Sequence, residues 1–137
     1  MSDRNESDLD PELHTIWDDI LAAAPSVLPA GDKVITVCTY RSNIEQAALY
    51  AIGRTVPGKI LTDAEPGTSK HNCVDVQLRP ASKAVDFGII RYGKYIGDGN
   101  DPSYTLIGEL AEQHGLEWAG RWVSFKEMCH VQLKDMT

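Results

Sequence analysis

The sequence is short of the features that define several protein classes: it has no long apolar run, little cysteine and few aromatic residues. No segment reaches the roughly 18 consecutive apolar residues of a membrane-spanning helix, so we expect no membrane insertion. The first ten residues, MSDRNESDLD, lack the apolar stretch of a signal peptide, which indicates synthesis in the cytoplasm without an export signal. The three cysteines form no CxxC pair, and their odd number argues against a full disulfide framework.

Basic charge is also scarce. The 137 residues carry a formal net charge of -7, and residues 1–19 hold seven acidic residues against one basic residue, Arg4. The remainder is nearly neutral and shows no basic stripe that could neutralise phosphates, so we expect no nucleic-acid binding. An acidic start of this kind is typical of a solvated segment that leads into a helix N-terminus. We therefore expect residues 1–9 to be a flexible N-terminus and residues 10–137 to form one domain.

The first half of the chain predicts two helices and a strand. A helix is expected from Pro11 to about Ala24, because Asp10 can cap it and apolar residues recur at helical spacing. The β-branched residues 33–39 indicate a strand. Ser42 and Glu45 match a capping box that opens a second helix. We expect that helix to end near Gly53 and to bury a face made of Ile44, Ala47, Ala48 and Ala51.

The second half contains a long loop followed by alternating short elements. Residues 54–83 are rich in Pro, Gly, Ser and Thr and predict an ordered loop, which in a small domain is usually functional. Residues 84–90 indicate a strand, with Asp86 on the face opposite to its apolar neighbours. An exposed, mobile loop (91–102), a helix (103–114) and strands at 116–119 and 128–133 complete the chain. The prediction is an α+β fold in which a small antiparallel sheet packs with about three helices.

Three residues are candidates for a metal site. His71 lies in the long loop, while Asp86 and His130 each interrupt an otherwise apolar strand. A buried carboxylate needs a partner or a metal, and two His with one Asp form a zinc set that leaves a position for water. Spacing alone leaves open that these are unrelated polar residues in hydrogen bonds. Glu127, three residues before His130, is either a general base beside the metal or a solvated surface charge.

Several motifs in order resemble a known family. Thr39-Tyr40-Arg41-Ser42, Gln46, residues 49–55, residues 57–60 and Ser69-Lys70-His71-Asn72 follow one another along the chain. Residues 82–87, with Asp86, and residues 120–130, with Trp122, Glu127 and His130, follow downstream. Over about residues 36–133 the sequence resembles the VanY-like D-alanyl-D-alanine carboxypeptidases and the phage L-alanyl-D-glutamate endopeptidases. Several motifs in the same order are more specific than any single motif. We therefore interpret the sequence as similar to this family of zinc metallopeptidases.

The resemblance implies a role for each matching residue. It places zinc on His71, Asp86 and His130, so the small sheet carries the metal site. Glu127 matches the catalytic acid/base. Arg41 matches an arginine that stabilises the oxyanion or a substrate carboxylate, for which a guanidinium is suited because it stays charged and donates in a fork. Substrate-binding positions are Trp122, Ser69 and Gln46.

Two departures from the family pattern bear on these assignments. The first His and the Asp are usually about seven residues apart in the family, whereas His71 and Asp86 are separated by fifteen positions. Residues 73–80 are therefore interpreted as an insertion. The insertion contains Asp75, which competes with Asp86 for the role of ligand. Ser82 also stands where the family commonly has Gly.

The family implies hydrolysis of the peptide stem of bacterial peptidoglycan by a single catalytic domain. We expect a monomeric phage-type endolysin that cuts the L-alanyl-D-glutamate bond and reaches the wall after holin-type release from the host cytoplasm. One alternative is a D-alanyl-D-alanine carboxypeptidase acting on cell-wall precursors. Another is a non-catalytic zinc-containing domain that binds the wall.

Overall fold

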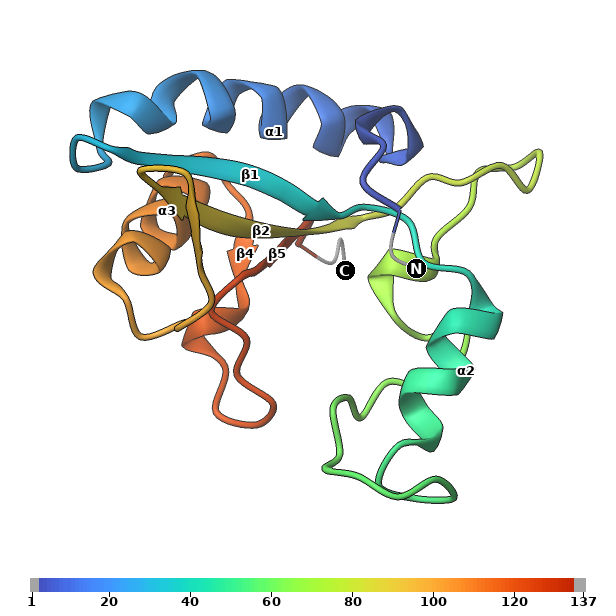
Figure 1. Cartoon of the computed structure of the whole chain (residues 1–137). Helices are drawn as coiled ribbons and strands as arrows, with labels where there is room; N and C mark the ends of the chain where they lie inside the picture. Colours follow the sequence, from blue (N-terminus) through green and yellow to red (C-terminus); the bar gives the residue numbers. More distant parts are fainter. Residues whose placement is uncertain (1–2, 135–137) are drawn as a thin grey trace.

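The computed structural model describes residues 3–134 and shows a sheet with helices on both sides (Figure 1). Its antiparallel strands run in the order β1-β2-β5-β4, and β3 also pairs with β2. The strand bounds are β1 Asp32–Cys38, β2 Ala84–Arg91, β3 Lys94–Ile96, β4 Glu117–Trp118 and β5 His130–Gln132. The α+β fold around a small antiparallel sheet is confirmed.

Three α-helices accompany the sheet in the described part of the chain. They are α1 (Pro11–Ala23), α2 (Asn43–Ala51) and α3 (Pro102–Gln113). Short 3-10 turns occur at Glu6–Asp8, Ala24–Ser26, Lys70–Asn72 and Ala119–Arg121. Within residues 3–134, none of the helices combines the length and the apolar character needed to cross a bilayer.

The predicted caps explain where the helices begin. The Asp10 side chain accepts a hydrogen bond from Glu12 N at the start of α1. Ser42 and Glu45 form the expected capping box at the start of α2. At its other end, Gly53 has a φ of +84°, a left-handed conformation that favours glycine after a helix.

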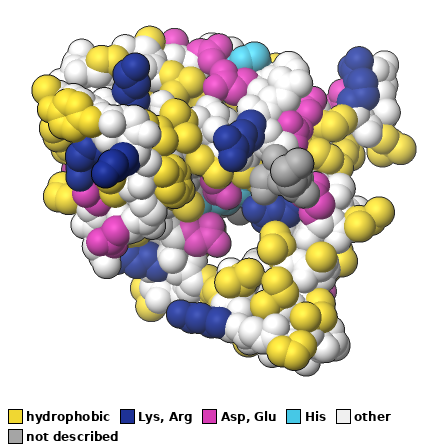
Figure 2. Space-filling model, viewed as in Figure 1, with side chains coloured by type: hydrophobic (Ala, Val, Ile, Leu, Met, Phe, Trp, Pro, Cys, Tyr) yellow, Lys and Arg dark blue, Asp and Glu magenta, His cyan; other side chains and the backbone are white. Residues whose placement is uncertain are grey.

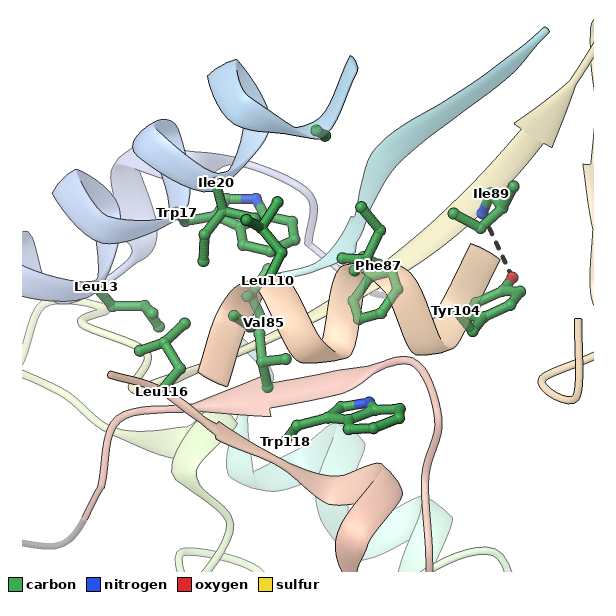
Figure 3. Close-up of a cluster of buried hydrophobic side chains, with 14 of the residues drawn as sticks. Leu13, Trp17, Ile20, Val85, Phe87, Ile89, Tyr104, Leu110, Leu116 and Trp118 are labelled. Atoms are coloured by element: carbon green, nitrogen blue, oxygen red, sulfur yellow. Dashed lines mark hydrogen bonds between the residues drawn. The ribbon is translucent and has the colours of Figure 1, made fainter. Parts of the chain in front are cut away.

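The hydrophobic core lies between one face of the sheet and helices α1 and α3 (Figure 3). Trp17 of α1, Phe87 of β2 and Tyr104 of α3 are each at most 2% exposed, and their rings pack in series with centroids 6.0 and 5.6 Å apart. Because side chains alternate along β2, the burial of Val85, Phe87 and Ile89 against the helices turns Asp86 to the other face. The core therefore fixes which side of the sheet carries the polar residues.

Helix α2 departs from the expected packing. It projects from the side of the sheet opposite α1 (Figure 1), and Ile44 is 83% exposed. Ala47 and Ala48 are exposed as well, while Gln46 is the buried residue of this helix. The predicted apolar face of α2 is thus wrong, because the helix lies on the polar side of the sheet and buries the residue that meets the site.

The segment 91–102 is more structured than a loop. Lys94–Ile96 forms strand β3 and pairs with the end of β2. Tyr92 and Gly93 connect the two strands with positive φ values of 47° and 81°. Positive φ at both central residues is typical of a tight hairpin turn whose twist matches that of the strands.

Residues 3–9 lie against the domain, although the sequence predicts a flexible start. Leu9 is 3% exposed within the core. Asp3 O accepts a hydrogen bond from Thr39 N, and Asp8 O accepts one from Ser82 N. Residues 1–2 lie outside the described part of the chain.

Candidate active site

Three polar residues form a row across the sheet. Asp86 in the central strand β2 pairs with Cys38 of β1 on one side and with His130 of β5 on the other. A bulge between Thr36 and Cys38 shifts the β1 register just before this row. Bulges re-aim the side chains that follow them, which accounts for a cysteine facing the polar side at this position.

The fourth residue, His71, comes from the long loop. It lies in the 3-10 turn Lys70–Asn72, whose N-cap is Ser69. The turn is fastened to the segment after β1, because His71 O accepts from Arg41 N at 2.9 Å and Asn72 Nδ2 donates to Arg41 O at 2.6 Å. His71 Nδ1 also lies 2.8 Å from Thr39 O. These contacts place the imidazole, 2% exposed, over the row.

Asp86 lies close to the imidazole rings of both histidines. Its Oδ1 lies 3.2 Å from His71 Nε2 and 2.8 Å from His130 Nδ1. Two ligands bound about 2.0–2.2 Å from a tetrahedral zinc ion lie roughly 3.3 Å from each other, so these separations are of the size that a shared ion requires. Two neutral imidazoles and one carboxylate are also the donor types that zinc prefers. The residues therefore fit the expected metal.

The electrostatics of the cluster depend on Asp86. Burial opposes its ionisation, but the charge of His71 and hydrogen bonds from both imidazoles outweigh burial and hold its pKa well below the usual range. Burial likewise opposes the charged form of His71, yet the Asp86 carboxylate raises the pKa of His71 to about 10. Without metal, the pair is thus a carboxylate with an imidazolium, and an incoming cation must displace that proton.

Glu127 lies at the edge of the cluster. Its carboxylate is 3.6 Å from His130 Nδ1, and Glu127, Asp86 and His130 can each bring a ligand atom within 4.8 Å of the others. Burial raises the pKa of Glu127, and the nearby Asp86 charge adds to this effect, while His130 opposes it. A carboxylate with a raised pKa beside a metal position suits a general base.

Arg41 also reaches the cluster. Its Nη2 lies 3.8 Å from Asp86 Oδ2 and 3.8 Å from Cys38 Sγ, and its Nη1 donates to Gln46 Oε1 at 3.0 Å. Gln46 has no exposed surface, and its Nε2 donates to Ala64 O at 2.8 Å. Gln46, predicted to bind substrate, is thus buried and hydrogen-bonded to Arg41, which it holds in place. The buried Nε of Arg41 finds no acceptor among residues 3–134.

A cleft of about 570 Å³ opens over these residues. It runs between the body of the domain and the lobe that carries α2 and the loop after it, as the hollow in Figure 2 shows. Ser69 and Trp122, two of the predicted substrate-binding residues, line it together with Leu49, Leu61 and Phe125. Trp122 stands 5.5 Å from the His130 ring, centroid to centroid, and its Nε1 donates to Glu117 Oε2 at 2.7 Å. These contacts fix the indole as a wall of the cleft.

The competing residue Asp75 is engaged elsewhere. It accepts hydrogen bonds from the backbone N of Gln77 and of Arg79 and pairs with the Arg79 side chain at 2.9 Å. These local bonds shape the turn within the predicted insertion, and they lower the pKa of Asp75. The geometry thus brings together His71, Asp86, His130, Glu127 and Arg41 and leaves Asp75 out.

Cys38 is a member of the site that the sequence does not single out. Its thiol is buried 3.9 Å from His71 Nδ1, and Cys38, His71 and Asp86 can each bring a ligand atom within 4.8 Å of the others. The only sequence signal is its place at the end of a strand, just before Thr39-Tyr40-Arg41. The bulge that turns the thiol inward leaves no mark in the residue pattern. All three cysteines are free.

Comparisons with known proteins identify similar sequences and similar solved structures. A family model described as D-alanyl-D-alanine carboxypeptidase matches residues 64–133. The chain is also similar to the peptidoglycan L-alanyl-D-glutamate endopeptidase CwlK of Bacillus subtilis strain 168. The two are 36% identical over 128 residues, which cover 93% of this chain and 74% of the relative.

Two solved structures share the fold. The L-Ala D-Glu endopeptidase ChiX of Serratia marcescens superposes with a TM-score of 0.67 at 17% identity, covering 98% of this chain and 89% of that one. A mutant of the vancomycin resistance D,D-pentapeptidase VanY, solved in complex with Zn(II), superposes with a TM-score of 0.58 at 18% identity. That match covers 91% of this chain and 72% of VanY.

Proposed function

The chain belongs to the D-alanyl-D-alanine carboxypeptidase family of metallopeptidases, and from this premise we propose that it is a zinc-dependent endopeptidase of the peptidoglycan stem. The observation that carries the proposal is the convergence of His71 Nε2 and His130 Nδ1 on Asp86 Oδ1, with Glu127 beside them, at the wall of a cleft. This arrangement offers a metal position and a base next to each other.

Zinc, when bound by His71, Asp86 and His130, supplies Lewis-acid chemistry to the scissile carbonyl and to water. Glu127 takes the proton of the attacking water at its carboxylate and passes it to the departing amine. Arg41 lines the cleft and places the positive charge of its guanidinium near the cluster, where it can stabilise a developing oxyanion. Trp122 closes one side of the cleft and limits the access of bulk water.

We propose that the bond cut is the one between L-alanine and D-glutamate. The relative CwlK, which is an L-alanyl-D-glutamate endopeptidase, supports this choice because its similarity extends over 93% of the chain. The test is digestion of purified muropeptides followed by mass spectrometry. Products that begin with D-glutamate would support the proposal. Loss of a single terminal D-alanine would instead establish the carboxypeptidase alternative, which the description of the family model favours.

A narrower proposal is that the enzyme serves as a phage-type endolysin. It rests on the resemblance of the motifs to phage endopeptidases. Expression in a bacterial host together with a holin would test it, with the Glu127→Gln variant as the matched control. Lysis by the wild type and not by the variant would support the role. Intact cells, despite active enzyme in the muropeptide assay, would assign the activity to another process.

A further inference from the structure

The two imidazoles present different nitrogens to the metal position. His71 Nδ1 lies 2.8 Å from Thr39 O, and a carbonyl oxygen can only accept, so the ring proton sits on Nδ1 and Nε2 faces Asp86. His130 is turned the other way. Its Nδ1 lies 2.8 Å from Asp86 Oδ1, and its Nε2 lies 2.9 Å from Gln132 Oε1. In each ring, the nitrogen that points away from Asp86 thus faces an oxygen. For His71 this is a backbone carbonyl oxygen, and for His130 it is the side-chain oxygen of Gln132.

We propose that Gln132 is the positioning residue that holds His130 in the tautomer needed for metal binding. The inference rests on the metal site proposed above. With the proton on Nε2, the ring donates to Gln132 Oε1 and leaves the Nδ1 lone pair for the metal. In the other neutral tautomer, two acceptors would face each other at 2.9 Å, which is unfavourable.

The fold makes this contact rigid. Gln132 follows His130 by two residues in β5, so both side chains lie on one face of the strand. Gln132 is only 8% exposed, and its backbone is paired with Ala84 of β2 on one side and Glu117 of β4 on the other. Partners that hold the second nitrogen of a metal-bound histidine orient the ring and raise its affinity for the metal.

Zinc affinity measured by competition with a chromophoric chelator tests the proposal without any substrate. Gln132→Met keeps the length of the side chain and removes the acceptor, and we expect it to weaken zinc binding about 10–100-fold. Gln132→Glu restores an acceptor and should bind zinc at least as tightly as the wild type. The control is Gln113→Met, the same substitution at an exposed glutamine at the end of α3, which does not line the cleft. This control should keep wild-type affinity.

A second readout is the imidazole nitrogen spectrum of the zinc-loaded wild type. We expect His130 to carry its proton on Nε2, and this measurement remains decisive if Gln132→Met fails to fold. Wild-type affinity in Gln132→Met, or a His130 ring protonated on Nδ1, would overturn the role of Gln132. Failure of the wild-type chain to bind zinc would instead refute the proposed metal site itself, so the two failures are distinguishable.

Discussion

Asp86 and His130 face each other in register across strands β2 and β5, with Asp86 Oδ1 2.8 Å from His130 Nδ1. The pair joins residues that lie 44 positions apart in the sequence. The sheet register brings these two side chains together, so the proposed metal position lies on paired strands. Residues on regular elements hold a site more precisely than residues on loops.

The first prediction follows from this pairing. Asp86→Ala should abolish zinc binding, whereas Asp75→Ala should leave it intact, because Asp75 is bound to its own turn and to Arg79. Metal content of both purified variants after gel filtration is the measurement. Zinc retained by Asp86→Ala and lost by Asp75→Ala would make Asp75 the ligand.

Glu127→Gln separates a catalytic role from a structural one. The amide keeps the size of the side chain but cannot take a proton, so activity on muropeptides should fall about 10²–10⁴-fold while fold and zinc content are unchanged. In the wild type, activity should also decline as the pH falls through the raised pKa of Glu127, because the base must be ionised. That acidic limb should be absent from the residual activity of the variant.

Two outcomes would contradict this assignment. A variant that loses zinc together with activity would make Glu127 a ligand or a support of the site. A variant that digests muropeptides at the wild-type rate would remove Glu127 from the mechanism.

Arg41→Lys is expected to be a severe change. Lysine keeps the positive charge but lacks the two Nη groups of arginine, which reach Gln46 and Asp86 at the same time. We expect kcat/KM to fall about 10²-fold, as for the loss of one oxyanion donor. Gln46→Met, which only frees the guanidinium, should lower kcat/KM less. Kinetics near wild type for Arg41→Lys would place Arg41 outside the reaction.

Zinc affinity should rise with pH. The pKa of His71 is about 10 in the metal-free protein, so zinc binding at neutral pH must release the His71 proton. A single displaced proton makes the apparent affinity increase about tenfold per pH unit below that pKa. Chelator competition at several pH values measures the slope, and a flat profile between pH 6 and 8 would contradict a protonated His71.

The same pKa values predict how the stability of the metal-free chain changes with pH. The raised pKa of His71 stabilises the fold below its ordinary value of 6.5, and this contribution is lost as the pH rises toward about 10. The lowered pKa of Asp86 adds stability above its ordinary value of 3.8 and is lost in acid. The melting temperature of chelator-treated protein should therefore be highest between these two ordinary values. Added zinc should remove the decline at high pH, since it replaces the proton on His71.

Gly108→Ala tests the packing under the sheet. A Cβ at Gly108 of α3 would lie 2.1 Å from Cε2 of the buried Trp118 ring, so the helix and the indole must move apart. Such overpacking typically costs about 1–3 kcal/mol of unfolding free energy. Gly97→Ala is the control, because its Cβ would meet Tyr95 at an ordinary 3.5 Å. Denaturant unfolding of the two variants gives the comparison, and equal stability would show that the contact is relieved without cost.

Much of the framework could be predicted from the sequence. The cap residues Asp10 and Ser42 mark where α1 and α2 begin, and the alternation of residues 84–90 puts Asp86 on the face opposite to the core. These features depend on neighbours within a few positions, so the local pattern carries them. The resemblance of the motifs adds the family and the set of residues His71, Asp86 and His130.

Other features were decided by tertiary structure. Ile44 is exposed and Gln46 is buried because α2 stands on the polar side of the sheet, where Arg41 and Ala64 offer hydrogen bonds to the amide. A helical pattern reports which residues share a face, but it does not report what covers that face.

The residues of the site also divide into those that the local sequence pattern places and those that only tertiary structure places. The sequence by itself determined the residue types available and the strand faces on which Asp86, His130 and Gln132 lie. Three features depended on the folded chain. The bulge in β1 turns Cys38 toward Asp86, and the turn 70–72 brings His71 to the site. Asp75 instead forms hydrogen bonds within its own turn. The reason is physical: strand register, bulges and the docking of loops depend on contacts between residues far apart in the chain, and no local pattern encodes such contacts.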